Sequence, residues 1–272
     1  MMLSIITVNL NNADGLRKTI ESVVSQTFTD YEYIIIDGAS TDGSIDVIKQ
    51  YADKITYWVS ESDKGIYNAM NIGILRAKGE YLQFLNSGDT LCSPTVLYSV
   101  FAMNINKDFI YGDIATIDNS EIIKTIHYPS NLDTLFFIHG MVSHQSIFHK
   151  RILFLDNLYS EDYKIAADWE FFLKMIVFKN ASYAKVDVIV SYVELGGISS
   201  NIDLMKLERR CILEKYFPKI VLMDLAQYYD QKHYSLYPYL SIFAKYPKLQ
   251  RTVKRFMKIL LFLSGKKNLI PR

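Results

Sequence analysis

Residues 81–89 read Tyr81-Leu82-Gln83-Phe84-Leu85-Asn86-Ser87-Gly88-Asp89, an apolar run typical of a buried strand that ends in a polar turn. Three earlier runs have the same strand-like character, and they span residues 3–8, 33–36 and 56–59. Stretches with the apolar spacing of helices separate the four runs, at residues 16–24, 44–51 and 66–77. This β-α-β-α-β-α-β order predicts an α/β fold with a Rossmann-like, doubly wound, mostly parallel sheet.

Polar side chains follow each of the four predicted strands. They are Asn9 and Asn11, Asp37, Asp63, and Asn86 with Asp89. Any one of these residues is explained by the preference of Asp and Asn for turns and helix caps. The carboxyl ends of parallel strands meet at one edge of a sheet, where ligands bind. The joint pattern therefore predicts a polar ligand site at that edge.

Asp89 is the residue of this set best suited to hold a metal ion. It follows Ser87 and Gly88, and a glycine at this point lets the backbone approach a ligand closely. A diphosphate leaving group needs a divalent cation, and such cations take oxygen ligands from one or two carboxylates together with the phosphates. Asp89 is therefore a candidate ligand of a divalent cation such as Mg²⁺ or Mn²⁺.

The later part of the chain continues the mixed pattern. It predicts a helix at 94–102, strands at 109–113, 143–148 and 186–193, and an aromatic-rich helix from Asp168 to about Phe178. The pattern becomes helical and basic near residue 200. We expect one α/β domain over 1–200, divided into a first half at 1–103 and a second half at 104–200. A helical, basic C-terminal extension is expected over 201–272.

Four segments resemble those of glycosyltransferase family 2 in the same order along the chain. Asn86-Ser87-Gly88-Asp89 is similar to the Asp-x-Asp-type motif of GT-A fold glycosyltransferases, and the other segments are 4–11, 36–44 and 61–73. The resemblance covers residues 2–195. It implies that 1–200 is a GT-A domain with a nucleotide-sugar-binding half at 1–103 and an acceptor half at 104–200. It also implies an inverting enzyme of the bacterial surface-glycan subgroup. Its donor would be a UDP-linked hexose or N-acetylhexosamine, and its acceptor a growing polysaccharide, a lipid-linked oligosaccharide or a protein-bound glycan.

The resemblance also implies roles for individual residues. Those expected at the nucleotide sugar are Val8, Asn9, Asp37, Asp42, Asp63, Lys64, Asn86, Ser87 and Asp89. Asn86 stands where the family usually has a first carboxylate, so it would be a neutral metal ligand beside Asp89. His144 could reach the metal, the diphosphate or the acceptor, although a lone histidine is as often a polar residue of the fold.

Asp168 resembles the family's aspartate at the start of the acceptor-side helix. This implies that it is the general base that takes the proton of the acceptor hydroxyl. The alternative is that Asp168 only caps that helix. Glu170 is the second candidate for the base, and Ala167 occupies a position where the family usually has an acidic residue.

The charges of the chain are unevenly distributed. Residues 231–272 contain ten Lys and Arg and no Asp or Glu, whereas residues 1–230 contain 20 basic and 29 acidic side chains. An acidic body argues against a nucleic-acid-binding protein. In residues 248–260, the apolar residues recur with the spacing of one helical face, and the basic residues lie around the rest of the helix. Such a helix could rest on an anionic membrane, pack on the body or mediate self-association.

No transmembrane helix is expected. The longest purely apolar run near the C-terminus, 259–263, is far shorter than the roughly 20 residues that span a bilayer. The N-terminus lacks the basic and small-residue features of a secretory signal. We expect a cytoplasmic protein, with the inner face of the membrane as its site of peripheral contact.

Other classes of protein fit the sequence less well. A sugar nucleotidyltransferase also uses a Rossmann-like sheet and a metal-binding Asp, but the turn at 9–14 has no glycine-rich phosphate loop. The same turn lacks the GxGxxG pattern of a dinucleotide-dependent oxidoreductase. A non-catalytic nucleotide- or glycan-binding module is the remaining alternative, and the presence of both Asp89 and Asp168 argues against it.

Overall fold

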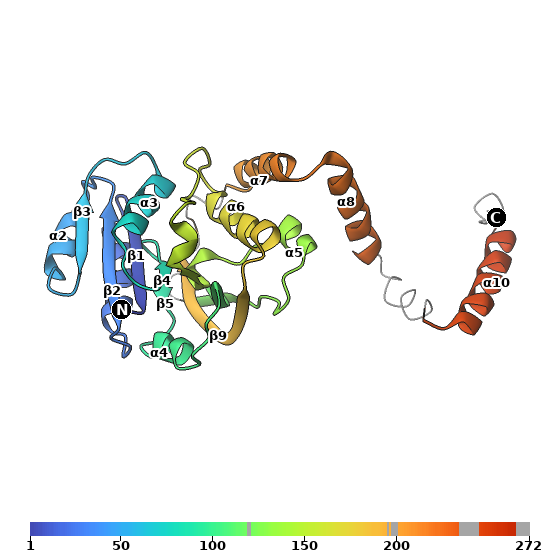
Figure 1. Ribbon diagram of the computed structural model, residues 1–272, viewed down its shortest axis with the longest axis horizontal. Helices are drawn as coiled ribbons and strands as arrows, with labels where there is room; N and C mark the ends of the chain where they lie inside the picture. Colours follow the sequence, from blue (N-terminus) through green and yellow to red (C-terminus); the bar gives the residue numbers. More distant parts are fainter. Residues whose placement is uncertain (119–120, 195, 197–200, 234–244, 265–272) are drawn as a thin grey trace. The chain divides into compact units, whose positions relative to one another are not determined.

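The computed structural model describes residues 1–118, 121–194, 196, 201–233 and 245–264. The chain divides into two compact units, residues 1–215 and 216–272 (Figure 1). The first unit contains the sheet and the helices packed on it. The boundary expected near residue 200 precedes helix α7 (Ile202–Tyr216), which groups with the first unit up to Lys215.

The first half of the sheet has the predicted parallel order. Its strands are β1 (Leu3–Asn9), β2 (Tyr31–Asp37), β3 (Tyr57–Ser60) and β4 (Tyr81–Phe84). They are joined by α1 (Ala13–Val24), α2 (Ser44–Gln50) and α3 (Ile66–Arg76). The strands are parallel and lie in the order β3-β2-β1-β4. This arrangement confirms the doubly wound α/β prediction.

Helices cover both faces of these strands because the apolar residues of each strand alternate between the faces. Leu3 and Ile5 of β1 belong to the buried cluster that contains Leu16 and Ile20 of α1. Ile6 faces α3 instead. A Cβ placed on Gly73 would lie 2.5 Å from Ile6 Cγ2, so the absence of a side chain lets α3 pack directly on the sheet.

The second half of the sheet is mixed. Its strands are β5 (Thr90–Leu91), β6 (Phe109–Asp118), β7 (Glu121–Ile126), β8 (Ile147–Lys150) and β9 (Tyr183–Glu194). The helices are α4 (Val96–Phe101), α5 (Thr134–His139), α6 (Ala167–Leu173) and the π-helical turn η3 (Lys174–Phe178). Strand β8 is antiparallel to both β4 and β6, and it thereby joins the two halves into one nine-stranded sheet.

The strand predicted over 143–148 is only partly formed. His144–Ser146 make a 3₁₀ turn, η1, and β8 begins at Ile147. Polar contacts explain the difference, because the Oγ atom of Ser146 donates to the carbonyl of Ser143 (3.0 Å), and the side chains of His144 and Gln145 bond to two aspartates across the site. The turn therefore directs both side chains toward the same region.

Aromatic rings fix α6 on the sheet. Phe171 of α6 stacks on Phe154 with ring centroids 4.2 Å apart, and Phe172 meets Phe109 of β6 edge to face at 4.8 Å. His149 is buried among these rings, and burial lowers its pKa to about 3. It is therefore a neutral core residue. The cluster holds the helix that carries Asp168.

The described part of the second unit is helical. It contains α8 (Lys219–His233) and α10 (Pro247–Leu263). Within the described residues, no helix is both long and apolar enough to cross a membrane.

Candidate active site

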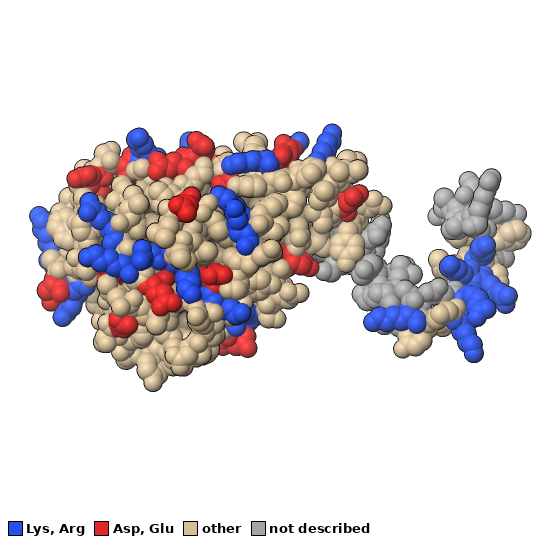
Figure 2. Space-filling view, in the orientation of Figure 1, with Lys and Arg blue, Asp and Glu red and all other residues tan. Residues whose placement is uncertain are grey.

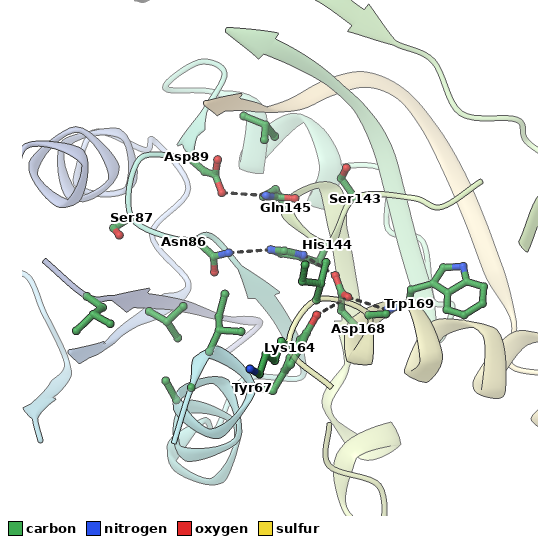
Figure 3. A pocket seen from close by; sticks show the side chains of 18 of the residues that line it. Tyr67, Asn86, Ser87, Asp89, Ser143, His144, Gln145, Lys164, Asp168 and Trp169 are labelled. Carbon is green, nitrogen blue, oxygen red and sulfur yellow. Dashed lines mark hydrogen bonds and ion pairs between the residues drawn. The ribbon is translucent and has the colours of Figure 1, made fainter. Parts of the chain in front are cut away.

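A cavity of about 610 Å³ opens at the carboxyl ends of β1 and β4 (Figure 3). Eight of the residues singled out from the sequence line it: Val8, Asn9, Asp63, Asn86, Ser87, Asp89, His144 and Asp168. The cavity also receives side chains from α6 and α7. The fold thus brings most of the predicted site residues, which come from five separate stretches of the chain, to one place.

Three of the predicted residues, Asp37, Asp42 and Lys64, do not line the cavity. Asp37 is completely buried, and its carboxylate accepts hydrogen bonds from Asn9 Nδ2 (2.7 Å), Ser60 Oγ (2.6 Å) and the backbone N–H of Ser40 (2.9 Å). Burial alone would raise the pKa of Asp37, but these hydrogen bonds outweigh it and hold the pKa below its usual value. Asp37 therefore holds Asn9 and the loop that follows Asp37 in place through hydrogen bonds, without lining the cavity itself.

Asp42 and Lys64 have structural partners of their own. Asp42 accepts from the N–H of Ala13 (2.8 Å) and from Ser44 Oγ (2.6 Å), which ties the start of α1 to that of α2. The N–H of Lys64 donates to Asn68 Oδ1 (3.2 Å) at the start of α3.

Asp89 is held in the cavity wall by a tight turn. Gly88 has φ +104°, a conformation that favours glycine. Gln145 Nε2 donates to Asp89 Oδ2 (2.9 Å), and the backbone N–H of Glu194 approaches Oδ1 at 3.3 Å. Burial raises the pKa of Asp89 to about 6 despite these two donors. Its charge is therefore incompletely compensated by the protein, as expected of a carboxylate that binds a cation.

A chain of hydrogen bonds runs from the metal motif to the predicted base (Figure 3). Asn86 Nδ2 lies 3.1 Å from His144 Nε2, and His144 Nδ1 lies 2.7 Å from Asp168 Oδ2. In this arrangement, the amide donates to Nε2 and the imidazole donates its Nδ1 proton to the carboxylate. Tyr67 OH donates to the other oxygen, Oδ1, of Asp168 (2.8 Å). Asp168 therefore has a fixed orientation in the wall.

The protonation states of the pair follow from these contacts. Burial opposes the charged form of both groups, but the mutual hydrogen bond and charge attraction lower the pKa of Asp168 and raise that of His144. Asp168 is therefore a carboxylate, and the shared proton lies on the imidazole. A carboxylate in this state can accept a proton.

Two alternatives were considered, that Asp168 only caps α6 and that Glu170 is the base, and the geometry bears on both. The N-cap of α6 is Ala166, and Asp168 is the second residue of the helix, so it is not the capping residue. Glu170 is also buried, but it forms an ion pair with Lys215 Nζ (2.8 Å) and does not line the cavity. Of the two acidic residues, only Asp168 faces the cavity.

Asp89 and Asn86 suit a divalent cation that is bound together with phosphates. Asn86 Oδ1 is buried and has no hydrogen-bond partner, which leaves an oxygen free for a ligand. Among the described residues, no three His, Cys, Asp or Glu side chains gather into a metal cluster. The donor set is therefore one carboxylate and one amide, which fits a hard cation that takes its remaining ligands from phosphates or water.

The structure adds site residues that the sequence did not single out. Tyr67 lies within the resembling segment 61–73, but its contact with Asp168 spans 101 residues of chain. Glu208 and Arg209 come from α7, where only tertiary contacts give them a role. The Glu208 carboxylate accepts from three backbone N–H groups before α6: Lys164 (2.8 Å), Ile165 (2.9 Å) and Ala166 (3.0 Å). Arg209 lies over the ring of Trp169.

The chain is similar to known proteins in sequence and in fold. The model of the family "Glycosyl transferase family 2" matches residues 4–156. A PGL/p-HBAD biosynthesis glycosyltransferase of Mycobacterium tuberculosis is 33% identical over 216 residues, covering 74% of this chain and 80% of that protein. An uncharacterized glycosyltransferase of Rickettsia typhi is 28% identical over 187 residues, covering 64% of this chain and 58% of that protein.

Two solved structures have the same fold. TarS 1–349 of S. aureus in complex with UDP-GlcNAc superimposes with a TM-score of 0.65 at 18% identity, over 93% of this chain and 78% of that one. The mannosyltransferase PcManGT of Pyrobaculum calidifontis, in complex with GDP-Man and Mn²⁺, gives 0.57 at 11% identity, over 92% and 86%. The family match and the sequence identity together establish that this chain belongs to glycosyl transferase family 2, as a glycosyltransferase with the GT-A fold.

Proposed function

We propose that the chain is an inverting transferase that uses a UDP-linked hexose or N-acetylhexosamine as donor. The acceptor is a hydroxyl group of a growing surface polysaccharide, a lipid-linked oligosaccharide or a protein-bound glycan. The observation that supports this best is the hydrogen-bonded chain from Asn86 through His144 to Asp168, because it links a metal motif to a candidate base within one cavity. The UDP-GlcNAc complex of the TarS structure supports UDP as the nucleotide.

The donor end of the cavity is assigned to Val8, Asn9 and Asp63, with Asn86, Ser87 and Asp89 at the diphosphate. Asp37 and Asp42 act on this end through the loops that they hold. Asp89 and Asn86 would hold Mg²⁺ or Mn²⁺, which neutralises the charge of the leaving diphosphate when bound. The Asp89 carboxylate, whose charge is poorly compensated by its own neighbours, is the main protein ligand in this proposal.

Asp168 receives the proton in the transfer step. The acceptor oxygen forms a bond to the anomeric carbon while the bond from that carbon to the diphosphate oxygen breaks, so the configuration inverts. The proton of the acceptor hydroxyl passes to Asp168. His144 and Tyr67 keep the carboxylate oriented and ionised before the reaction. His144 has both ring nitrogens engaged in these contacts, and it would have to release Asn86 to bind a metal ion.

Two substitutions test the two ends of the site. Asp168→Asn should keep donor binding and lower transfer by about a hundredfold or more, because the amide cannot accept the proton. Asp89→Ala should weaken metal-dependent UDP binding. The measurements are calorimetry with UDP and Mg²⁺ or Mn²⁺, and turnover on a panel of sugar nucleotides. Unchanged transfer by Asp168→Asn would remove the base assignment, and unchanged UDP binding by Asp89→Ala would remove the metal assignment.

We also propose that α10 lies on an anionic membrane surface. Leu249, Val253, Phe256 and Leu260 recur with the spacing of one helical face, and the last two are 60% and 44% exposed. The basic residues of the helix are Lys248, Arg251, Lys254, Arg255 and Lys258, and the helix has no acidic residue. Figure 2 shows Lys and Arg without Asp or Glu at this helix. Like charges oppose its self-association, whereas anionic lipid complements it.

A further inference from the structure

Arg209 presents a cation to the cavity, where the charge of Asp168 acts on it without forming an ion pair among the described residues. It lines the wall together with Trp169 and Lys164. Its guanidinium carbon lies 4.9 Å from the centre of the Trp169 ring. None of the ion pairs found among the described residues includes Arg209, whereas its neighbour Arg210 pairs with Glu214 on the outer surface of the same helix.

The groups that hold this cation are themselves fixed. Glu208, the preceding residue, is buried and binds the three backbone N–H groups of 164–166, which anchors α7 to the loop before α6. The Trp169 indole N–H donates to the carbonyls of Phe137 (3.1 Å) and Gly140 (3.2 Å). The guanidinium is therefore held against an immobile ring, and little conformational freedom is left to lose when a ligand binds.

A partly buried guanidinium is unfavourable in free energy unless its charge is compensated. Burial lowers the pKa of Arg209, and the negative charge of Asp168 offsets this effect only in part. Stacking on one aromatic ring offsets only part of the cost of removing a charge from water. A guanidinium binds phosphate and carboxylate groups through parallel N–H donors, and such an anion would supply the missing compensation.

The position of Arg209 relative to Asp168 indicates which substrate would bring the anion. Asn86 of the predicted metal motif contacts Asp168 through His144. The Trp169 ring lies on the opposite side of Asp168 from Asn86 (Figure 3). The donor diphosphate is assigned to Asn86 and Asp89 in the proposed function, on which this argument rests. We propose that Arg209, stacked on Trp169, binds an anionic group of the glycosyl acceptor, either a phosphate ester or a carboxylate.

The proposal can be tested by calorimetry with the full chain first saturated with UDP and Mg²⁺. Methyl phosphate is then titrated as the probe, and acetate is titrated in a second series to distinguish a phosphate from a carboxylate site. We expect one of the two probes to bind the wild-type protein, and Arg209→Gln to weaken its binding at least about tenfold, as for loss of a charge-assisted hydrogen bond. Arg209→Lys should retain part of the affinity.

Arg210→Gln is the matched control, because it removes an exposed arginine from the adjacent position of α7. It should leave probe binding unchanged, and all three variants should bind UDP as the wild type does. A probe that binds only without UDP would assign Arg209 to the diphosphate and overturn the proposal. Equal probe binding by wild type and Arg209→Gln, or none by the wild type, would leave Arg209 as a packing residue. Absence of UDP binding to the wild type would instead overturn the donor site, and the acceptor assignment with it.

Discussion

The Asp89 carboxylate is buried, and its charge opposes folding. Its pKa in the folded chain, about 6, exceeds the ordinary value of 3.8. A carboxyl group with a raised pKa favours the folded state when protonated, so this contribution is present at low pH and is lost as the pH rises through about 6. At pH 8, the shift of about two pKa units corresponds to a penalty of about 3 kcal/mol.

We therefore expect Asp89→Asn to stabilise the metal-free protein at pH 8 by about 1 to 2 kcal/mol, since the amide removes the charge but loses one acceptor. The gain should shrink as the pH falls from 8 to 5. Urea unfolding at the two pH values measures it. Asp53→Asn, at a side chain 72% exposed, is the control and should show no such pH dependence. A variant that is less stable than the wild type at pH 8 would contradict the interpretation.

If Asp89 holds the metal as proposed, the same titration should affect donor binding. Protons compete with a cation for the Asp89 carboxylate, so UDP binding in the presence of Mg²⁺ should weaken as the pH falls below about 6. Binding measured from pH 8 to pH 5 should show this loss, and excess Mg²⁺ should shift the midpoint to lower pH. An affinity that is constant over this range would argue against Asp89 as the main metal ligand.

At the scale of elements, the contact between α7 and the loop before α6 decides how Asp168 is held. The Glu208 carboxylate accepts three backbone hydrogen bonds, and glutamine can supply only one acceptor oxygen in its place. Glu208→Gln should cost about 2 to 4 kcal/mol of stability, as expected when buried N–H groups lose a charged acceptor. It should also lower kcat more than it changes UDP affinity, because the disturbed loop leads to the proposed base, Asp168, rather than to the proposed donor end.

Glu214→Gln is the comparison on the same helix, because Glu214 is exposed and its ion pair among the described residues is with Arg210, one helical turn away. This change should cost less than about 0.5 kcal/mol. Urea unfolding and steady-state kinetics of the two variants give the result. Equal effects of the two substitutions would mean that the Glu208 contact is not what orders the loop.

The helices and strands also show which parts of the fold and of the site could be predicted from the sequence. The four parallel strands and their helices were predictable because side chains on one face recur every second residue in a strand and every three to four residues in a helix. In β1, Leu3 and Ile5 face α1, whereas Ile6 faces α3 on the other side of the sheet. Asn86 and Asp89 were singled out because they follow a strand and resemble the family's metal motif, and Asp168 because it resembles the family's aspartate at the start of a helix. The turn at His144–Ser146 was missed, since it is set by contacts with Asp89 and Asp168 rather than by local pattern.

The roles of other site residues could not be predicted from the local sequence. Glu208 and Arg209 occupy a helix whose sequence gives no sign of which residues face a cavity. Asp37 illustrates the opposite difficulty, because its motif is conspicuous but the structure shows its carboxylate fully occupied by Asn9, Ser40 and Ser60. A motif can therefore identify the region of a site without distinguishing a ligand contact from a residue that supports one.

At the scale of the whole molecule, the basic residues of α10 give a prediction about lipid. Each Lys or Arg near an anionic surface contributes about 1 kcal/mol, and α10 has five of them. The full chain should sediment with vesicles that contain phosphatidylglycerol, and not with phosphatidylcholine vesicles. High salt should release it. Lys254→Glu with Lys258→Glu should abolish the binding without changing UDP affinity.

The control is Lys49→Glu with Lys54→Glu, two exposed lysines of the first unit, which should still sediment. Binding that survives charge reversal in α10 would contradict the assignment. A concentration-dependent dimer in analytical ultracentrifugation that the α10 variant loses would favour self-association instead.

The contact between Glu208 and the loop at 164–166 also has a consequence for synthesis on the ribosome. Chains emerge N-terminus first, and β1 to β4 with their helices can assemble as soon as the first half of the sheet is available. The loop before α6 acquires its carboxylate partner only after α7 has left the exit tunnel. A nascent chain stalled before residue 208 would thus assemble the first half of its sheet ahead of a correctly held Asp168, and translation itself would delay the onset of turnover until α7 has been synthesised.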